Sequence, residues 1–181
     1  MNAKQAEQVL AEADLLHSEA EIDAALNKMA NEINQRFNDT DLVVFCVMNG
    51  ALIPAGMLLP RLTFSFKLDY LHATRYCEKT TGSDLKWLKK NQIDITDKSV
   101  LIIDDILDEG YTLENIAQFC KSEGAGEVYT AVLAEKLHNR GNNFKADIVG
   151  LTVIDRYVFG MGMDYKGYLR HLPAIYAVKD M

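Results

Sequence analysis

Three carboxylates gather at the end of one apolar run, in the segment VLIIDDILDEGYT at residues 100–112. Asp104 and Asp105 follow the apolar residues directly, and Asp108 comes three positions later. Carboxylates accept hydrogen bonds from sugar hydroxyls, bind Mg²⁺ and take protons from nucleophiles. Gly110 then allows a ligand to approach the backbone closely. The segment therefore has the residue types of a binding and proton-transfer site.

The position of these acids, between an apolar run and an expected helix, predicts a site for an anion. In open α/β sheets, ligands lie beyond the carboxyl ends of the strands, where loop amides and helix N-termini are exposed. Thr112 stands where the helix is expected to begin, so it can cap the helix or bond a phosphate oxygen. Because acids repel phosphate but bind ribose hydroxyls, the segment predicts a ribose-phosphate ligand rather than phosphate alone.

Other known binding loops do not fit this segment. An EF-hand that starts at Asp105 would place Leu107 at its third position and Ile116 at its twelfth, and neither is a calcium ligand. The chain has neither the Walker pattern GxxxxGK[ST] nor a Rossmann glycine fingerprint. An acidic loop that only caps a helix remains an alternative.

The elements that must position these acids follow from the hydrophobic pattern. Helices are expected at 3–16 and 19–37, from Asn49-Gly50 to about Leu59, and from near Thr112 to Gly124. Strands are expected at 42–48, 62–72, 84–89, 100–103, 127–134, 147–154 and 174–178. Alternation along 62–72 predicts one half-buried apolar face from Leu62 to His72, and 73–83 is expected to be a long exposed loop. This order predicts an α/β fold with a largely parallel twisted sheet flanked by helices.

Composition and charge limit the class of protein. The chain has 181 residues, 49% of them hydrophobic, which predicts one folded domain. Its net charge of −7 argues against a nucleic-acid partner held through bulk electrostatics. We expect a cytoplasmic protein with no membrane partner, because the N-terminus carries acidic residues and no apolar signal-peptide core, and no apolar run approaches the length of a membrane span. Cys46, Cys77 and Cys120 lack the CxxC spacing, and the first and last are expected to be buried thiols.

The segment at residues 100–112 resembles the phosphoribosyl-pyrophosphate-binding motif of type I phosphoribosyltransferases. The resemblance extends from about residue 40 to 178, in the order of the hypoxanthine-guanine branch. It implies a single domain, 1–181, with a core at about 38–154 and a small hood built from the N-terminal helices and about 155–181. It also implies Mg²⁺-dependent transfer of a phosphoribosyl group to hypoxanthine or guanine, in a homodimer or homotetramer.

For the donor, the resemblance assigns ribose and phosphate contacts to residues 104–112. Asp104 and Asp105 match the acidic pair that binds the ribose hydroxyls, although the first is commonly Glu. Asp108 matches the carboxylate proposed as the catalytic base beside the attacking purine nitrogen. The loop around the 5-phosphate would comprise Asp108, Glu109, Gly110, Tyr111 and Thr112, with Glu109 in place of a commoner Thr.

For pyrophosphate, the resemblance points to three separate segments. Met48, Asn49 and Gly50 match a loop in which relatives often have a lysine preceded by an unusual cis peptide. Asn49 lacks that charge. Arg75 and Tyr76 match the mobile loop that closes over the site, and we expect Arg75 to compensate for the missing lysine. Arg170 would contact the pyrophosphate from the C-terminal segment.

For the purine, the resemblance assigns Lys136 to the exocyclic oxygen of 6-oxopurines. Tyr157 would stack on the ring, the Val158 backbone would bond its edge, and Asp164 would lie beside it. The metal ligands would be Asp164, Asp104 and Asp105. Without the resemblance, Lys136 is equally a surface lysine after a strand, and the residues around Tyr157 equally a strand end and a turn.

Two other functions remain alternatives. One is a regulator that kept the fold, senses nucleotides and binds RNA or DNA; the acidic charge disfavours it. The other is a transferase that prefers xanthine or another base. The retained acids and Lys136 favour catalysis over regulation.

Overall fold

The computed structural model describes residues 1–75, 85–138, 140 and 142–179. Its centre is a six-stranded sheet in the order β4-β3-β2-β5-β6-β7. The strands are β2 Leu42–Met48, β3 Lys67–Arg75, β4 Leu85–Lys89, β5 Ser99–Leu107, β6 Glu127–Leu137 and β7 Ile148–Ile154. Only β4 pairs antiparallel, with β3. The predicted α/β fold with a largely parallel sheet is confirmed.

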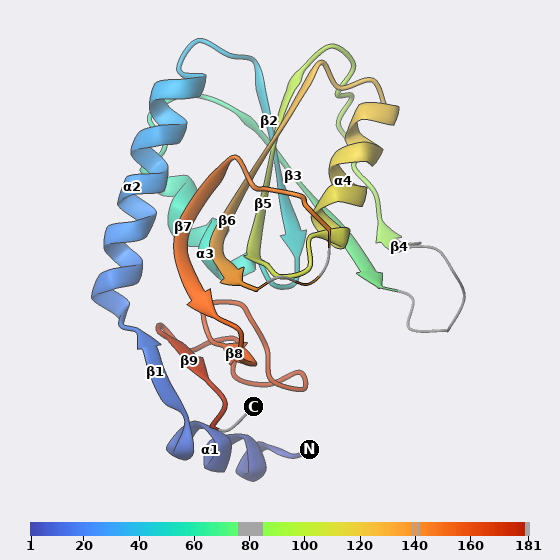
Figure 1. Ribbon diagram of the computed structural model, residues 1–181. Helices are drawn as coiled ribbons and strands as arrows, with labels where there is room; N and C mark the ends of the chain where they lie inside the picture. The colour runs from blue at the N-terminus through green and yellow to red at the C-terminus, as the bar shows by residue number, and fades with distance from the viewer. Residues whose placement is uncertain (76–84, 139, 141, 180–181) are drawn as a thin grey trace.

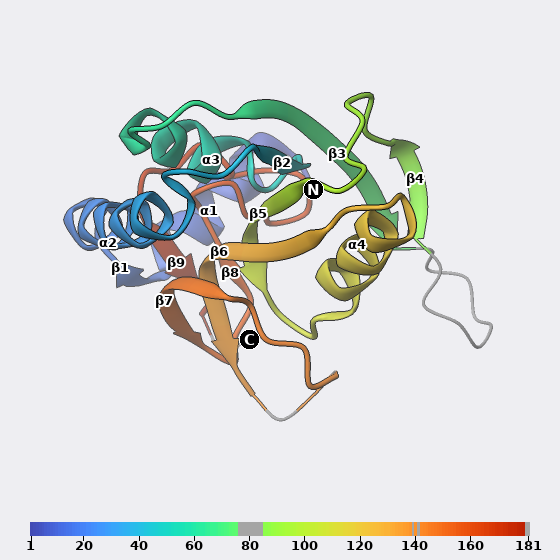
Figure 2. The same ribbon diagram turned by 90° about the horizontal axis from the view of Figure 1, so that it is seen from above.

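Helices cover both faces of this sheet. On one face lie α2, Glu19–Phe37, and α3, Leu52–Leu58, which runs into the short 3-10 helix η1, Leu59–Arg61. On the other lies α4, Tyr111–Ser122, as the view from above shows (Figure 2). Strand β2 and the first half of β5 are buried along their length, which explains their unbroken apolar sequences.

A smaller unit lies below the carboxyl ends of the parallel strands (Figure 1). It consists of α1, Ala3–Glu12, and a three-stranded antiparallel sheet in the order β1-β9-β8. These strands are β1 Asp14–His17, β8 Val158–Phe159 and β9 Ile175–Ala177. The unit has its own apolar cluster around Phe159, whereas α2 packs on the main sheet. Of the two N-terminal helices, only α1 therefore packs in the hood.

Two predicted elements are wrong at their ends. The helix expected at 3–16 stops at Glu12, because residues 14–17 pair with β9 instead. The strand expected from residue 62 begins at Lys67, and residues 62–66 form no strand. The helix expected from Thr112 to Gly124 forms at 111–122, and Gly124 adopts the predicted left-handed conformation with φ 89°.

Strand β3 buries the opposite face from the one predicted. Leu71 and Ala73 are buried, whereas Leu68 and Tyr70 are 53% and 45% exposed. The apolar alternation was identified correctly, but its conspicuous face points away from the core of this chain. That face lines a groove of about 410 Å³ with residues of β2 and α3.

Two of the three cysteines are structural. Cys46 and Cys120 are free and buried, as predicted, and burial raises the pKa of each thiol to about 12. Cys77 lies outside the described residues. Within the described part of the chain, no helix is long and apolar enough to cross a membrane.

Candidate active site

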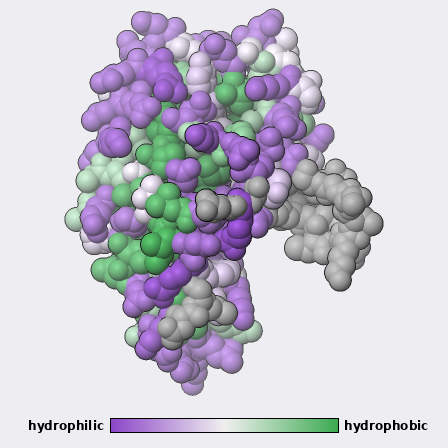
Figure 3. All heavy atoms as spheres, in the orientation of Figure 1, coloured by the Kyte–Doolittle hydropathy of each residue, from purple (hydrophilic) through white to green (hydrophobic). Residues whose placement is uncertain are grey.

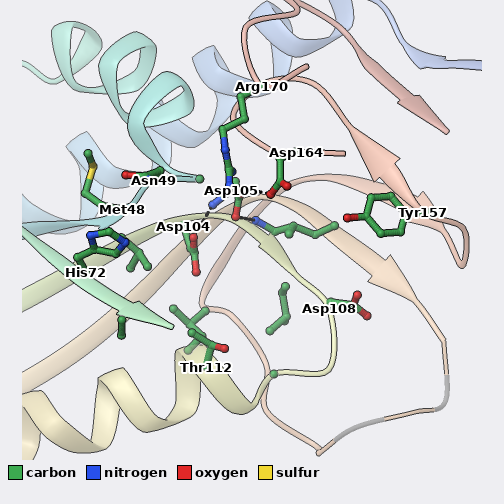
Figure 4. Close-up of a pocket in the computed structure, with 17 residues that line it drawn as sticks. Met48, Asn49, His72, Asp104, Asp105, Asp108, Thr112, Tyr157, Asp164 and Arg170 are labelled. Carbon is green, nitrogen blue, oxygen red and sulfur yellow. Dashed lines mark hydrogen bonds and ion pairs between the residues drawn. The ribbon is translucent and has the colours of Figure 1, made fainter. Parts of the chain in front are cut away.

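A cavity of about 600 Å³ opens between the carboxyl ends of the central strands and the hood (Figure 4). Met48, Asn49 and His72 lie on one side of it and Tyr157 on the other (Figure 4). A second cavity of about 250 Å³ adjoins it. Residues that line both are Asp105, Ile106, Asp108, Tyr157 and Asp164. The two cavities therefore form one continuous site.

The acidic pair at the end of β5 lies at the centre of this site. Asp104 is only 8% exposed, and its Oδ1 accepts a hydrogen bond from the Asp105 amide at 2.9 Å. Burial raises the pKa of Asp104 well above its usual value, and the adjacent Asp105 raises it further. Burial also raises the pKa of Asp105, although the Arg170 charge opposes this. The pair is short of positive charge, so hydroxyl donors or a cation would stabilise it.

The loop after β5 turns into α4 at Gly110, which has φ 83° and is the N-cap residue. Thr112 therefore lies inside the first turn, and the prediction that it caps the helix is wrong. Asp108, Gly110 and Thr112 line the cavity, whereas the described lining does not include Glu109 or Tyr111. The exposed amides of the first turn and the positive end of the helix dipole give this loop the groups that bind an anion.

Asn142, in the connection after β6, supports the same loop from behind. Its backbone N–H donates to the Glu109 carbonyl at 3.0 Å, and its Nδ2 donates to Glu114 Oε2 at 2.5 Å. A Cβ on Gly110 would lie 2.2 Å from the Asn142 Oδ1. Gly110 suits this left-handed φ, and a larger side chain here would force the Asn142 side chain to move.

The turn after β2 forms the left side of the cavity in Figure 4. The Met48–Asn49 peptide bond is cis, and Met48, Asn49 and Gly50 all line the cavity. A Cβ on Gly50 would lie 2.1 Å from Asp105 Oδ2, so this turn packs directly on the acidic pair. The structure brings the predicted pyrophosphate turn and the predicted ribose acids together.

The hood contributes a cation and a carboxylate to the opposite wall. Arg170 donates through Nη1 to the Gly162 carbonyl at 2.6 Å and pairs through Nη2 with Asp164 Oδ1 at 2.7 Å. The second oxygen of Asp164 accepts from the Gly167 amide at 2.7 Å. Both side chains line the main cavity, where Arg170 places a positive charge.

Asp108 is held by two basic side chains at the smaller cavity. Its Oδ2 is 2.7 Å from Lys136 Nζ, and its Oδ1 is 2.8 Å from His138 Nε2. Burial alone would raise the pKa of Asp108, but the hydrogen bond and charge of Lys136 and the hydrogen bond of His138 hold it below its usual value. Asp108 is therefore an ionised carboxylate that faces both cavities.

The chain matches the family described as "Phosphoribosyl transferase domain" over residues 13–166. It is 30% identical to the hypoxanthine phosphoribosyltransferase of Escherichia coli K12, over 90% of this chain and 93% of that one. It is 31% identical to the hypoxanthine-guanine phosphoribosyltransferase of Aquifex aeolicus, over 92% and 94%. The chain belongs to the phosphoribosyltransferase family, in its hypoxanthine-guanine branch.

Solved structures agree with this assignment. A hypoxanthine phosphoribosyltransferase from Staphylococcus aureus superposes with a TM-score of 0.88 and 25% identity, over 99% of this chain and 96% of that one. A hypoxanthine-guanine phosphoribosyltransferase from Bacillus anthracis superposes with a TM-score of 0.86 and 28% identity, over 91% and 98%. The sheet and hood described above are thus the fold of this family.

The acids of this phosphoribosyltransferase fit a Mg²⁺ ion that is held jointly with substrate phosphates and water. In the described ranges, no group of three or more His, Cys, Asp or Glu side chains is placed to hold a metal. Mg²⁺ usually takes one or two carboxylates, with substrate phosphates and water as its other ligands. Asp104 and Asp105 are buried and short of neighbouring positive charge, and they offer such oxygens at the cavity. Both oxygens of Asp164, by contrast, already accept hydrogen bonds.

The site of this phosphoribosyltransferase contains residues that the sequence did not single out. His72 lines the cavity from β3, opposite Met48 in the parallel register. In the connection after β6, His138 contacts Asp108, and Asn142 contacts the loop after β5. A polar connection after a strand was the only available signal for the last two. The predicted Tyr76 and the Arg75 side chain lie outside the described residues.

Proposed function

We propose that this protein transfers the phosphoribosyl group of phosphoribosyl pyrophosphate to a 6-oxopurine, hypoxanthine or guanine, and releases pyrophosphate. The observation that carries the proposal is the continuity of the two cavities across Asp105 and Asp108. The larger one has the phosphate loop and Arg170, and the smaller one has Lys136 and Tyr157. Asp108 stands at their junction, where the sugar and the base would meet. We take the main sheet and the hood as the core and lid of one catalytic domain.

In the proposed reaction, the lone pair of a purine ring nitrogen forms a bond to the anomeric carbon. The bond from that carbon to the pyrophosphate oxygen breaks, and its electron pair leaves with pyrophosphate. Asp104 and Asp105 hold the ribose hydroxyls, and the first turn of α4 holds the 5-phosphate. Arg170 stabilises charge on the leaving group. Asp108 accepts the proton that the purine loses.

Mg²⁺ is the proposed cofactor. Asp104 and Asp105 would hold it together with the donor, and Asp164 would reach it through water or by releasing Arg170. When bound, the ion supplies positive charge that neutralises the pyrophosphate oxygens. The raised pKa values of the acidic pair support a cation at this place.

Lys136 is proposed to select the base. Its Nζ is a donor at the smaller cavity, so it favours an exocyclic oxygen over the amino group of adenine. Tyr157 is 44% exposed and packs edge-on against Tyr165 at 5.2 Å, which leaves a ring face available for stacking.

The test is pyrophosphate release from phosphoribosyl pyrophosphate with hypoxanthine, guanine, xanthine or adenine, each with and without Mg²⁺. We expect Mg²⁺-dependent turnover with the first two and none with adenine. Lys136→Met should lower kcat/KM for the 6-oxopurine by about 100-fold or more, because the purine oxygen loses its donor. Faster turnover with xanthine would make the protein a xanthine transferase. Donor binding without turnover of any base would contradict catalysis and favour the regulator.

We also propose that the protein is a homodimer or homotetramer and acts in the cytoplasm. The apolar face of β3, with Leu68 and Tyr70, is exposed beside Leu52 of α3, which is 56% exposed. A second apolar area lies around β7 (Figure 3), where the register partners Leu137 and Ile154 are 57% and 47% exposed. One self-complementary interface gives a dimer, and two give a tetramer.

Substituting Leu68 by Glu is expected to lower the mass measured by light scattering, because the new charge would be buried between two copies. Lys67→Glu is the matched control, since it places the same side chain on the other face of β3. A wild-type protein that has the mass of one copy at micromolar concentration would contradict the proposal.

A further inference from the structure

In the described part of the chain, His138 is the only histidine that contacts Asp108, and its side chain is buried. It follows the end of β6, two residues after Lys136, and its side chain is only 5% exposed. Its Nε2 lies 2.8 Å from Asp108 Oδ1. The contact therefore places a nearly fully buried ring nitrogen on the proposed catalytic carboxylate.

The protonation of His138 follows from its second contact. The backbone N–H of Arg140 donates to His138 Nδ1 at 3.0 Å. A ring nitrogen that accepts a hydrogen bond carries no proton, so in the neutral ring the proton is on Nε2. His138 therefore donates from Nε2 to Asp108 Oδ1, and a backbone amide fixes the direction of that bond.

In the free protein, both oxygens of Asp108 are engaged, since Lys136 Nζ contacts Oδ2 at 2.7 Å. Lys136 also lines the smaller cavity, where the proposed function places the purine oxygen. A lysine drawn to that oxygen weakens its contact with Oδ2. The carboxylate would then rotate freely unless a second donor held Oδ1.

We propose that His138 is a positioning residue, which holds Asp108 through Oδ1 so that Oδ2 faces the purine ring nitrogen once Lys136 has turned to the purine oxygen. This inference rests on the proposed function. Lys136 would exchange its hydrogen bond to Asp108 for one to the purine oxygen, whereas His138 would keep its hydrogen bond to Asp108. Arg140 does not replace it, because its Nη2 is 3.9 Å from Asp108 Oδ1 and is bound to Asp155.

The test compares His138→Leu, which removes the donor, with His138→Gln, whose amide N–H can reach the position of Nε2. The Leu variant should lower kcat with a 6-oxopurine by about 10-fold, the effect of one hydrogen bond to a charged group. The donor KM should not change, because the phosphate loop is not altered. The Gln variant should stay within about 3-fold of the wild type.

Two further measurements separate positioning from a structural role. Thermal unfolding should show similar Tm values for the two variants, and ¹⁵N NMR of the wild type should show the neutral ring with its proton on Nε2. Three outcomes would each overturn the proposal. The first is a wild-type kcat in the Leu variant, and the second is an equal loss of kcat in both variants with a parallel fall in Tm. The third is a proton on Nδ1 of His138. A wild type without turnover, but with the Nε2 proton present, would refute the proposed function and remove the positioning role with it.

Discussion

Asp108→Asn is expected to lower kcat for phosphoribosyl transfer by about 10²- to 10³-fold, the usual contribution of a positioned general base. The carboxylate lies at the junction of the two cavities and is 2.7 Å from Lys136 and 2.8 Å from His138. An amide cannot take a proton at neutral pH. Its NH₂ group would also face one of those two donors, so one hydrogen bond would be lost. Binding of the donor should survive, because Arg170 and the first turn of α4 are untouched.

The pH dependence of this effect follows from the direction of the pKa shift. Burial would raise the pKa of Asp108, but the hydrogen bond and charge of Lys136 and the hydrogen bond of His138 hold it below its usual value. Lowering the pKa keeps the base ionised until the pH falls below the usual range for Asp, which is about 3.9. The loss of kcat in Asp108→Asn should therefore be uniform from roughly pH 6 to 9 and should not appear as a shift of the profile.

The measurement is kcat with saturating donor and 6-oxopurine, together with the donor Kd by calorimetry. Asp155→Asn is the matched control, since Asp155 is an exposed carboxylate that binds Arg140 in the same region. A near-normal kcat in Asp108→Asn would show that Asp108 is not the base.

Much of this site could be predicted because its chemistry is contiguous in the sequence. Asp104, Asp105, Asp108 and Gly110 belong to one strand, one loop and one helix start, and local pattern is enough to place them. The apolar runs of β2 and β5 are equally local, because a strand buried on both faces must be apolar throughout.

The features that the sequence did not predict depend on contacts between distant residues. Strand β1 looks like the end of a helix, and only its pairing with β9, more than 150 residues later, makes it a strand. The contact of His138 with Asp108 likewise depends on β5 and β6 being neighbours in the sheet. The exposed face of β3 was assigned to the core because alternation shows that a strand has an apolar face, but not what covers it.

Gly162→Ala is expected to lower kcat/KM for the donor by about 100-fold or more, because a displacement of about 1 Å in a positioned site has an effect of this size. A Cβ at this position would lie 1.9 Å from the Gly50 carbonyl oxygen and 3.0 Å from its carbon. Those are backbone atoms, so no side-chain rotation relieves the clash. A Cβ on Gly50 would in turn lie 2.1 Å from Asp105 Oδ2, so the hood, the turn after β2 and the acidic pair are packed in direct succession. A methyl group at 162 must move the hood away or push Gly50 into Asp105, the acid proposed to bind the ribose.

Gly167→Ala is the matched control that isolates this clash. Gly162 and Gly167 both have a left-handed φ, 99° and 87°, so both variants carry a backbone strain of about 1–2 kcal/mol. At Gly167 a Cβ meets nothing within 4 Å, and the amide that donates to Asp164 is retained. Chemical denaturation should show the loss of unfolding free energy from the strain in both variants and a larger loss in Gly162→Ala, which also carries the clash, whereas donor kcat/KM should fall only in Gly162→Ala. Equal donor kinetics in the two variants would mean that the hood can shift without disturbing Gly50, and that its contact with the turn after β2 does not set the geometry of the proposed pyrophosphate site.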